Sequence, residues 1–116
     1  MARRHLAIFL KGAVEKILAG RKQVEIRLSL GKVLPYAEIQ KEDKIYLKVS
    51  GGKILGDVEV DNVLFYNKLD SRIFRKIEEE YFSAVKMDKT FWQTKKKSKY
   101  ATIIFLKNPK TSKVTG

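Results

Sequence analysis

The feature that decides the fold is the nine-residue stretch Gly20–Leu28, GRKQVEIRL. Before it, apolar residues between 14 and 18 recur at helical spacing, and Gly20 stands where a glycine commonly ends a helix. After it, apolar and polar residues alternate, which predicts a half-buried strand. Side chains two positions apart on a strand share a face, so Glu25 and Arg27 are predicted to lie opposite the apolar side chains.

The rest of the chain continues this mixture of strands and short helices. Strands are predicted over residues 5–10, 23–28, 44–49, 53–65 and 100–106, and helices over about 14–19, 70–81 and a short segment after Asp88. Glycines at 51 and 52 predict a hairpin, and Gly56 a bend or bulge. The last strand is apolar on both faces, which predicts a central position in the sheet.

This order of elements predicts an α+β fold: a mixed sheet curled into a small β-barrel, with two to three short flanking helices. A single domain is expected over residues 1–106. Pro109 is expected to end the last strand, so residues 107–116 are predicted to form a basic, flexible C-terminal tail.

Composition excludes several kinds of chemistry. The chain has 116 residues, no cysteine and one histidine, His5. There can be no disulfide and no thiolate nucleophile, and a metal site is not expected. No apolar stretch approaches the roughly 20 residues that cross a bilayer. We therefore expect a cytoplasmic protein that needs no metal and no cofactor.

Charge is the first functional clue, because the net charge of +12 is unevenly distributed. Residues 1–36 carry eight basic and two acidic residues, residues 37–80 carry eight and ten, and residues 86–116 carry nine and one. If the two basic ends meet, they form one face that attracts polyanions such as nucleic acid. A solvated lysine surface is the alternative, and a membrane surface is less favoured because no amphipathic helix pairs lysines with a bulky apolar face.

Three side chains around the predicted turn are candidates for a ligand site. Lys22 and Arg27 could hold a phosphate or a carbonyl oxygen, and Glu25 could accept from a base amino group or orient the two cations. From spacing alone, a surface ion pair on a solvent-facing strand is the simpler interpretation.

Aromatic and basic residues near the C-terminus are further candidates, because bases stack on exposed rings. Trp92 is the leading stacking candidate, but burial in the core is an equal alternative. Neighbouring residues on a helix diverge by about 100°, so Trp92 and Phe91 are not expected to be equally buried. The lysines that follow could contact phosphates or form a solvated loop. These are Lys95, Lys96, Lys97 and Lys99.

The pattern Gly20-x-Lys22-x-x-Glu25-x-Arg27 after a short helix resembles the signature of the ASCH domain, a branch of the PUA-like superfamily of small β-barrels. The resemblance covers roughly residues 5–106. It implies a cleft lined by the motif residues and a role in RNA binding. Hydrolases of acylated cytidine nucleosides and proteins linked to RNA cleavage belong to the same family.

This chain departs from the hydrolase-like members, which have a threonine where it has Glu25 and use a glutamate from the helical region. Glu78, Glu79 and Glu80 occupy that region here, and a solvated helix end is the favoured interpretation of the triplet. A buried neutral lysine can act as a base, but Glu25 beside Lys22 is expected to favour the ammonium ion.

The leading prediction is therefore a non-catalytic RNA-binding module that holds a nucleotide or modified base in a polar cleft, with single-stranded or structured RNA as its partner. The alternative is a metal-independent hydrolase, an amidohydrolase of acylated cytidine or a ribonuclease, in which Lys22 and Glu25 would be catalytic. A protein-interaction domain with a basic surface is a third possibility.

Overall fold

The computed structural model describes residues 3–31 and 39–112. Five strands and three helices follow one another along the described chain. Their bounds are β1 (Arg4–Phe9), α1 (Lys11–Leu18), β2 (Val24–Ser29), β3 (Lys44–Val49), β4 (Ile54–Tyr66), α2 (Ser71–Val85), α3 (Lys89–Lys95) and β5 (Tyr100–Thr111).

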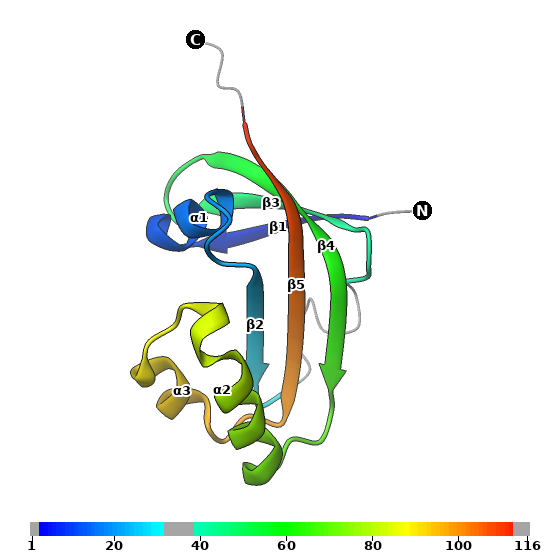
Figure 1. Ribbon diagram of the computed structural model, residues 1–116, viewed down its shortest axis with the longest axis vertical. Helices are drawn as coiled ribbons and strands as arrows, with labels where there is room; N and C mark the ends of the chain where they lie inside the picture. Colours follow the sequence, from blue (N-terminus) through cyan, green and yellow to red (C-terminus); the bar gives the residue numbers. More distant parts are fainter. Residues whose placement is uncertain (1–2, 32–38, 113–116) are drawn as a thin grey trace.

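All five strands form one mixed sheet in the order β1-β3-β4-β5-β2. The β1–β3 pair is parallel, and the other three pairs are antiparallel. Figure 1 shows the long strands β4 and β5 running along the molecule, while β1 and β3 cross its upper end. In the described part of the chain, β1 and β2 each pair with one strand, so they form the two edges of a curled half-barrel. The predicted α+β class, mixed sheet and flanking helices are confirmed.

The curl depends on irregularities in the two long strands. Pairing between β4 and β5 shifts register twice, after Asp57 and after Val60. The first shift leaves Asn108 and Pro109 out of the ladder, and Asn108 has φ 52°. Such bulges bend a strand and increase its twist, which lets one strand serve both halves of the sheet. The strand end predicted before Pro109 is wrong: because a proline inside a bulge removes no ladder hydrogen bond, β5 continues to Thr111.

The predicted flexible tail is corrected in the same way. Residues 107–111 are part of β5, and Lys107 pairs with Glu42 at 2.8 Å. The remaining segment, residues 113–116, lies outside the described residues.

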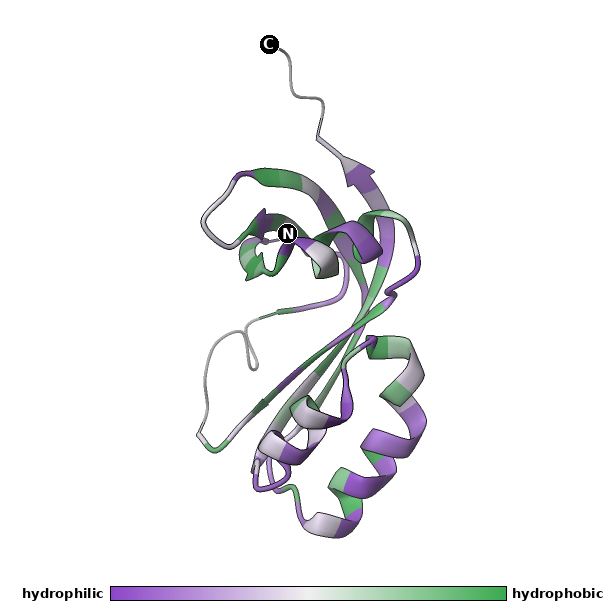
Figure 2. Cartoon of the chain, turned by 90° about the vertical axis from the view of Figure 1, so that its left-hand side faces the viewer, coloured by the Kyte–Doolittle hydropathy of each residue, from purple (hydrophilic) through white to green (hydrophobic). Residues whose placement is uncertain are grey.

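Two apolar cores cover the opposite faces of the sheet. One joins β2 and β5 to α2 and α3, and Ile26, Ile103 and Trp92 belong to it. The other fills the inside of the curl under α1, and Val14 and Ile104 belong to it. The adjacent residues 103 and 104 thus enter different cores, which confirms the prediction of a central last strand. Figure 2 shows green bands interrupted by purple and white ones along the strands.

Helices α2 and α3 each begin with an aspartate cap. The Asp70 carboxylate accepts a hydrogen bond from the backbone N–H of Ile73 at 2.8 Å, and Asp88 accepts one from that of Phe91 at 3.0 Å. Both satisfy N–H groups that a helix start leaves unpaired. Helix α1 ends before Gly20, whose φ of 76° is the left-handed value expected of a C-terminal glycine. The turn after it delivers Lys22 to the start of β2.

Strand β1 is attached at its start by a buried carboxylate. Asp43 is 2% exposed and accepts hydrogen bonds from the backbone N–H groups of Arg3 and Gln40, both at 2.9 Å. The His5 ring nitrogen Nε2 lies 2.8 Å from the same carboxylate. Burial raises the pKa of Asp43, but these bonds outweigh that effect and leave the pKa below its ordinary value. His5 therefore has a structural partner in Asp43.

Candidate ligand-binding cleft

A cleft of about 490 Å³ runs along the free edge of β2, and we call it the seam cleft. The C-terminal end of β1 and the start of α1 form one wall, and α3 with the loop before it forms the other. Lys22, Glu25 and Arg27 all line it. The volume lies within the range of small-molecule sites in proteins. The three side chains predicted from the sequence motif are therefore gathered in one concavity.

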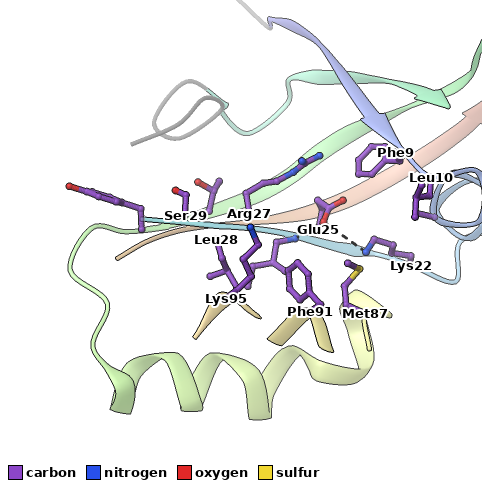
Figure 3. Close-up of a pocket in the computed structure, with 14 residues that line it drawn as sticks. Phe9, Leu10, Lys22, Glu25, Arg27, Leu28, Ser29, Met87, Phe91 and Lys95 are labelled. Atoms are coloured by element: carbon purple, nitrogen blue, oxygen red, sulfur yellow. Dashed lines mark hydrogen bonds and ion pairs between the residues drawn. The ribbon is translucent and has the colours of Figure 1, made fainter. Parts of the chain in front are cut away.

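Lys22 is almost fully buried, with a side chain 2% exposed. Its Nζ donates a hydrogen bond to the backbone carbonyl of Val85 at the end of α2. Glu25 Oε1 lies 3.9 Å from the same nitrogen (Figure 3). Burial lowers the pKa of Lys22, Glu25 raises it, and Arg27 and Lys16 lower it, so the net pKa is below the ordinary 10.5. Glu25 favours the ammonium form, as expected, but desolvation of the buried amine outweighs the carboxylate and lowers the pKa overall.

Glu25 also shows which backbone groups face the cleft. Its Oε1 accepts a hydrogen bond from the N–H of Ile26 at 2.9 Å. The backbone carbonyls of Gln23 and Ser29 accept hydrogen bonds from the N–H groups of Leu106 and Lys99. The odd-numbered residues of β2 are therefore the ones whose backbone groups pair with β5. On an antiparallel edge strand, the alternate residues point their N–H and C=O groups outward. Backbone groups of Ile26 and Leu28 therefore face the seam cleft.

Arg27 connects the two edges of the half-barrel. Its guanidinium carbon lies 5.2 Å from the centre of the Phe9 ring on β1. Figure 3 shows Glu25 and Arg27 on the β1 side of β2, with Phe91 and Lys95 on the opposite side. A cation over an aromatic ring contributes about 0.5–1 kcal/mol at exposed sites. The contact leaves Arg27 exposed to solvent at the cleft mouth.

Helix α3 supplies an aromatic and a cationic side chain to the cleft. Phe91 and Lys95 lie one helical turn apart and both line it. The prediction of Trp92 as an exposed stacking ring is wrong: it is 1% exposed and packs edge-on against Phe91 and Phe74. The adjacent ring, Phe91, takes the position in the cleft wall, in accordance with the 100° rotation between neighbours on a helix.

The lysine run is divided between two surfaces. Lys95 lines the seam cleft, whereas Lys96 and Lys97 line a separate hollow between α2 and α3. Lys99 is exposed and lines neither. Arg3 and Arg4 do not join the lysine run, since β3 and β4 separate β1 from β5 in the sheet. They line a cavity of about 670 Å³ inside the curl, which shares Glu25 and Arg27 with the seam cleft.

The glutamates at 78, 79 and 80 do not line the seam cleft, within the residues that the structure describes. Glu79 and Glu80 are exposed, as the interpretation of a solvated triplet predicted, but they lie within α2 rather than at its end, because the helix continues to Val85. Among residues 3–31 and 39–112, no cluster of three His, Asp or Glu side chains could hold a metal ion.

Several lining residues were missed by the sequence reasoning. Phe9 and Met87 face the cleft from elements far from the motif, and buried Thr102 lies opposite Arg27 on β5. The sequence contained one indication of Phe91 as a lining residue, because residues 91 and 92 on a helix could not both face the core. Phe9 had none, since its position depends on the curl that brings β1 to β2.

Comparison with known proteins places the chain by family and fold. The ASCH domain family model matches residues 11–110. No curated protein matches the sequence. None of the described helices has the length and apolar character to cross a membrane.

Solved structures agree with the family match. ASCH from Zymomonas mobilis is similar with a TM-score of 0.70 at 11% identity, over 91% of this chain and 68% of that one. An ASCH domain from Lactobacillus crispatus gives 0.59 at 13% identity, over 90% and 79%. The hypothetical protein PH0355 gives 0.62 at 22% identity, over 92% and 99%. At these identities the similarity concerns the fold.

Proposed function

The chain belongs to the ASCH domain family, and we propose that it binds RNA by holding one nucleotide in the seam cleft. The observation that carries the proposal is the combination of groups along the edge of β2. A buried carboxylate, outward-facing backbone groups, aromatic side walls and three basic side chains share one cleft of about 490 Å³. A base needs polar partners for its edges and an apolar face for stacking, and a phosphate needs cations.

The base is proposed to enter beside Phe91, where stacking on a ring contributes roughly 1–3 kcal/mol. Its polar edge would meet the free edge of β2, with the carbonyl of Ile26 as acceptor and the N–H of Leu28 as donor. Glu25 is an additional acceptor for an exocyclic amino group. Arg27 and Lys95 at the mouth would bind the flanking phosphates.

RNA is the proposed partner because unstacked bases of loops and single strands are the usual targets of sequence-specific RNA recognition. A pocket that takes one base needs a nucleotide already free of its helix. RNA binding is also the general role expected of this family, as the resemblance of the motif implies.

The test is titration of fluorescent single-stranded and hairpin RNA by anisotropy between about 50 and 200 mM salt. Replacing Arg27 by Ala should weaken binding about tenfold, or 1.4 kcal/mol. Arg21→Ala is the matched control, because it removes an equal charge six residues away from an exposed position that does not line the cleft. Equal losses in the two variants, no binding at low salt, or equal affinity for DNA of the same sequence would contradict the proposal.

A hydrolytic function is the second candidate, and one observation favours it. The amine of Lys22 is buried, has a lowered pKa and lies beside Glu25. An amine with a lowered pKa is more readily deprotonated and can take a proton from an attacking water. Incubation with acylated cytidine or labelled RNA tests this. Turnover that is lost in both Lys22→Ala and Glu25→Gln would establish the enzyme, and no turnover by the wild type would leave binding as the function.

A further inference from the structure

A second basic surface lies on the other side of α3, and we call it the helix groove. This hollow of about 350 Å³ lies between α2 and α3. Arg75 lines it from α2, and Lys96 and Lys97 line it from the end of α3; all three are exposed. Glu78 is the one acidic residue among those lining the hollow, so the cations outnumber it three to one. The groove therefore favours an anionic ligand.

Helix α3 separates this groove from the seam cleft. Phe91 and Lys95 face the cleft, while Trp92 and Lys96, each one residue later, face the groove. A step of one residue rotates a helical side chain by about 100°, so the two surfaces share one short helix as their dividing wall. Figure 1 shows α3 beside α2 at one end of the molecule. A ligand that crosses the C-terminal end of α3 can reach both surfaces.

We propose that the helix groove binds backbone phosphates of the same RNA whose nucleotide occupies the seam cleft; this inference rests on the proposed function. A helix with its side chains is about 10 Å across, and stacked nucleotides rise by about 3.4 Å each. The groove would therefore hold phosphates about three nucleotides from the one in the cleft. The binding site becomes bipartite, with one end that holds a base and another that holds the backbone.

The character of the groove fits phosphate rather than base. Its one aromatic side chain at the α3 wall, Trp92, is 1% exposed and has no face on which a base could stack. The indole N–H of Trp92 is buried and has no hydrogen-bond partner among the described residues. Exposed cations at the rim, with no exposed ring among the side chains that line the hollow, suit phosphate oxygens.

The experiment compares two triple variants that lower the charge equally. The groove variant is Arg75→Ala/Lys96→Ala/Lys97→Ala. The control variant replaces three exposed lysines that line neither surface, Lys41→Ala/Lys53→Ala/Lys110→Ala. Affinities are measured for a mononucleotide and for single-stranded RNA of two to eight nucleotides, across 50 to 200 mM salt. Circular dichroism and thermal melting confirm that both variants are folded.

Wild type and control should gain affinity once the RNA exceeds about four nucleotides, and the groove variant should lose that gain while it binds the mononucleotide unchanged. Each phosphate contact on a single strand adds about 0.7 to the slope of log affinity against log salt. Loss of three contacts should make this slope shallower by about 2. Raising the salt from 50 to 200 mM should therefore cost the groove variant about 18-fold less affinity than it costs the wild type. Equal behaviour of the groove and control variants would overturn the groove proposal.

Failure of the groove is distinguishable from failure of the proposed function. If Arg27→Ala weakens mononucleotide binding but the groove variant matches the control, only the groove is overturned. If wild-type protein binds no RNA of any length, both proposals are overturned.

The chain offers an independent readout, because Trp92 is its only tryptophan. The single indole N–H signal in a ¹H–¹⁵N spectrum should shift with an eight-nucleotide RNA and stay in place with the mononucleotide. The longer RNA should not move it in the groove variant. A signal that stays in place with every RNA while the oligonucleotide binds would count against the groove. Replacing Glu78 by Gln should strengthen oligonucleotide binding, since it removes the opposing charge.

Discussion

Replacement of Glu25 by Gln should lower the pKa of Lys22 still further. The carboxylate lies 3.9 Å from Nζ, and both side chains are nearly buried. Glu25 raises the pKa of Lys22, whereas burial, Arg27 and Lys16 lower it. Two unit charges about 4 Å apart attract each other by about 1 kcal/mol in bulk water and about 4 kcal/mol at an effective dielectric constant of 20. Loss of the charge should therefore destabilise the ammonium form by an amount between these limits.

The assay is a pH titration of the lysine side chains by heteronuclear NMR with labelled Cε and Nζ. The Lys22 signal should titrate below 10.5 in the wild type and at lower pH still in the Glu25→Gln variant. Glu15→Gln is the matched control. Glu15 lies 4.0 Å from Lys11, but both side chains are mostly exposed, so water screens the pair. Glu15 is not among the charges that shift the pKa of Lys22, so the control substitution should leave the Lys22 titration unchanged.

Stability should follow the same titration. Folding disfavours the charged form of Lys22, so the unfolded chain binds more protons between the folded and unfolded pKa values. The free energy of unfolding should rise with pH from the lowered pKa of Lys22 up to about 10.5, relative to a Lys22→Met protein that lacks the group. In Glu25→Gln the rise should begin at lower pH. A Lys22 that titrates at or above 10.5, or that ignores the loss of Glu25, would refute the claim that desolvation governs this site.

Three further predictions concern the scaffold and the division between core and cleft. A Cβ added at Gly56 would lie 2.3 Å from the carbonyl oxygen of Lys110, so Gly56→Ala should lower the free energy of unfolding by about 1–3 kcal/mol. A Cβ at Gly12 would have no atom within 4 Å, so Gly12→Ala should stabilise α1 by about 0.5–1 kcal/mol. Chemical denaturation measures both, and the reverse order would contradict the packing. Trp92→Ala should lower the free energy of unfolding by about 3–5 kcal/mol, because the ring is in the core. Phe91→Ala should mainly weaken RNA binding, by about 1–3 kcal/mol, because that ring lines the cleft. If only the folded Trp92 variant lost RNA binding, the assignment of Trp92 to the core and Phe91 to the cleft would be reversed. Burial raises the pKa of Asp43, but its hydrogen bonds lower the pKa overall. The wild type should therefore lose stability as the pH falls below about 4, and Asp43→Asn should lack that loss. Parallel curves of stability against pH for the two proteins would contradict the prediction.

Local patterns in the sequence predicted what depends on local interactions. The strand predicted over residues 44–49 is β3, with the same bounds. The aspartates at 70 and 88 cap their helices, because capping involves a side chain and an N–H three residues away. The alternation after Gly20 placed Glu25 and Arg27 on one face, because side-chain direction along a strand is set by the backbone.

Other features depend on contacts between distant segments and were not predictable from local patterns. The carbonyl that accepts the Lys22 hydrogen bond belongs to a residue 63 positions away in the sequence. That residue lies at the end of α2, and burial of the Lys22 amine lowers its pKa. The sequence shows the neighbouring Glu25 but not the helix end that covers the amine. Likewise, Pro109 lies inside a strand only because a bulge opposite β4 takes it out of the ladder.

The state of Lys22 connects the two candidate functions. A charged Lys22 in a site that disfavours charge attracts a phosphate or carbonyl oxygen strongly, because few waters compete with the ligand. A bound anion would in turn raise the pKa of Lys22 and keep the amine protonated, which strengthens binding and removes the base. A neutral carbonyl substrate would leave the amine close to its unliganded pKa. The same lysine would thus support the proposed binding when the ligand presents a negative charge and the proposed proton transfer when it does not, so the charge of the ligand at Nζ would decide between the two proposals.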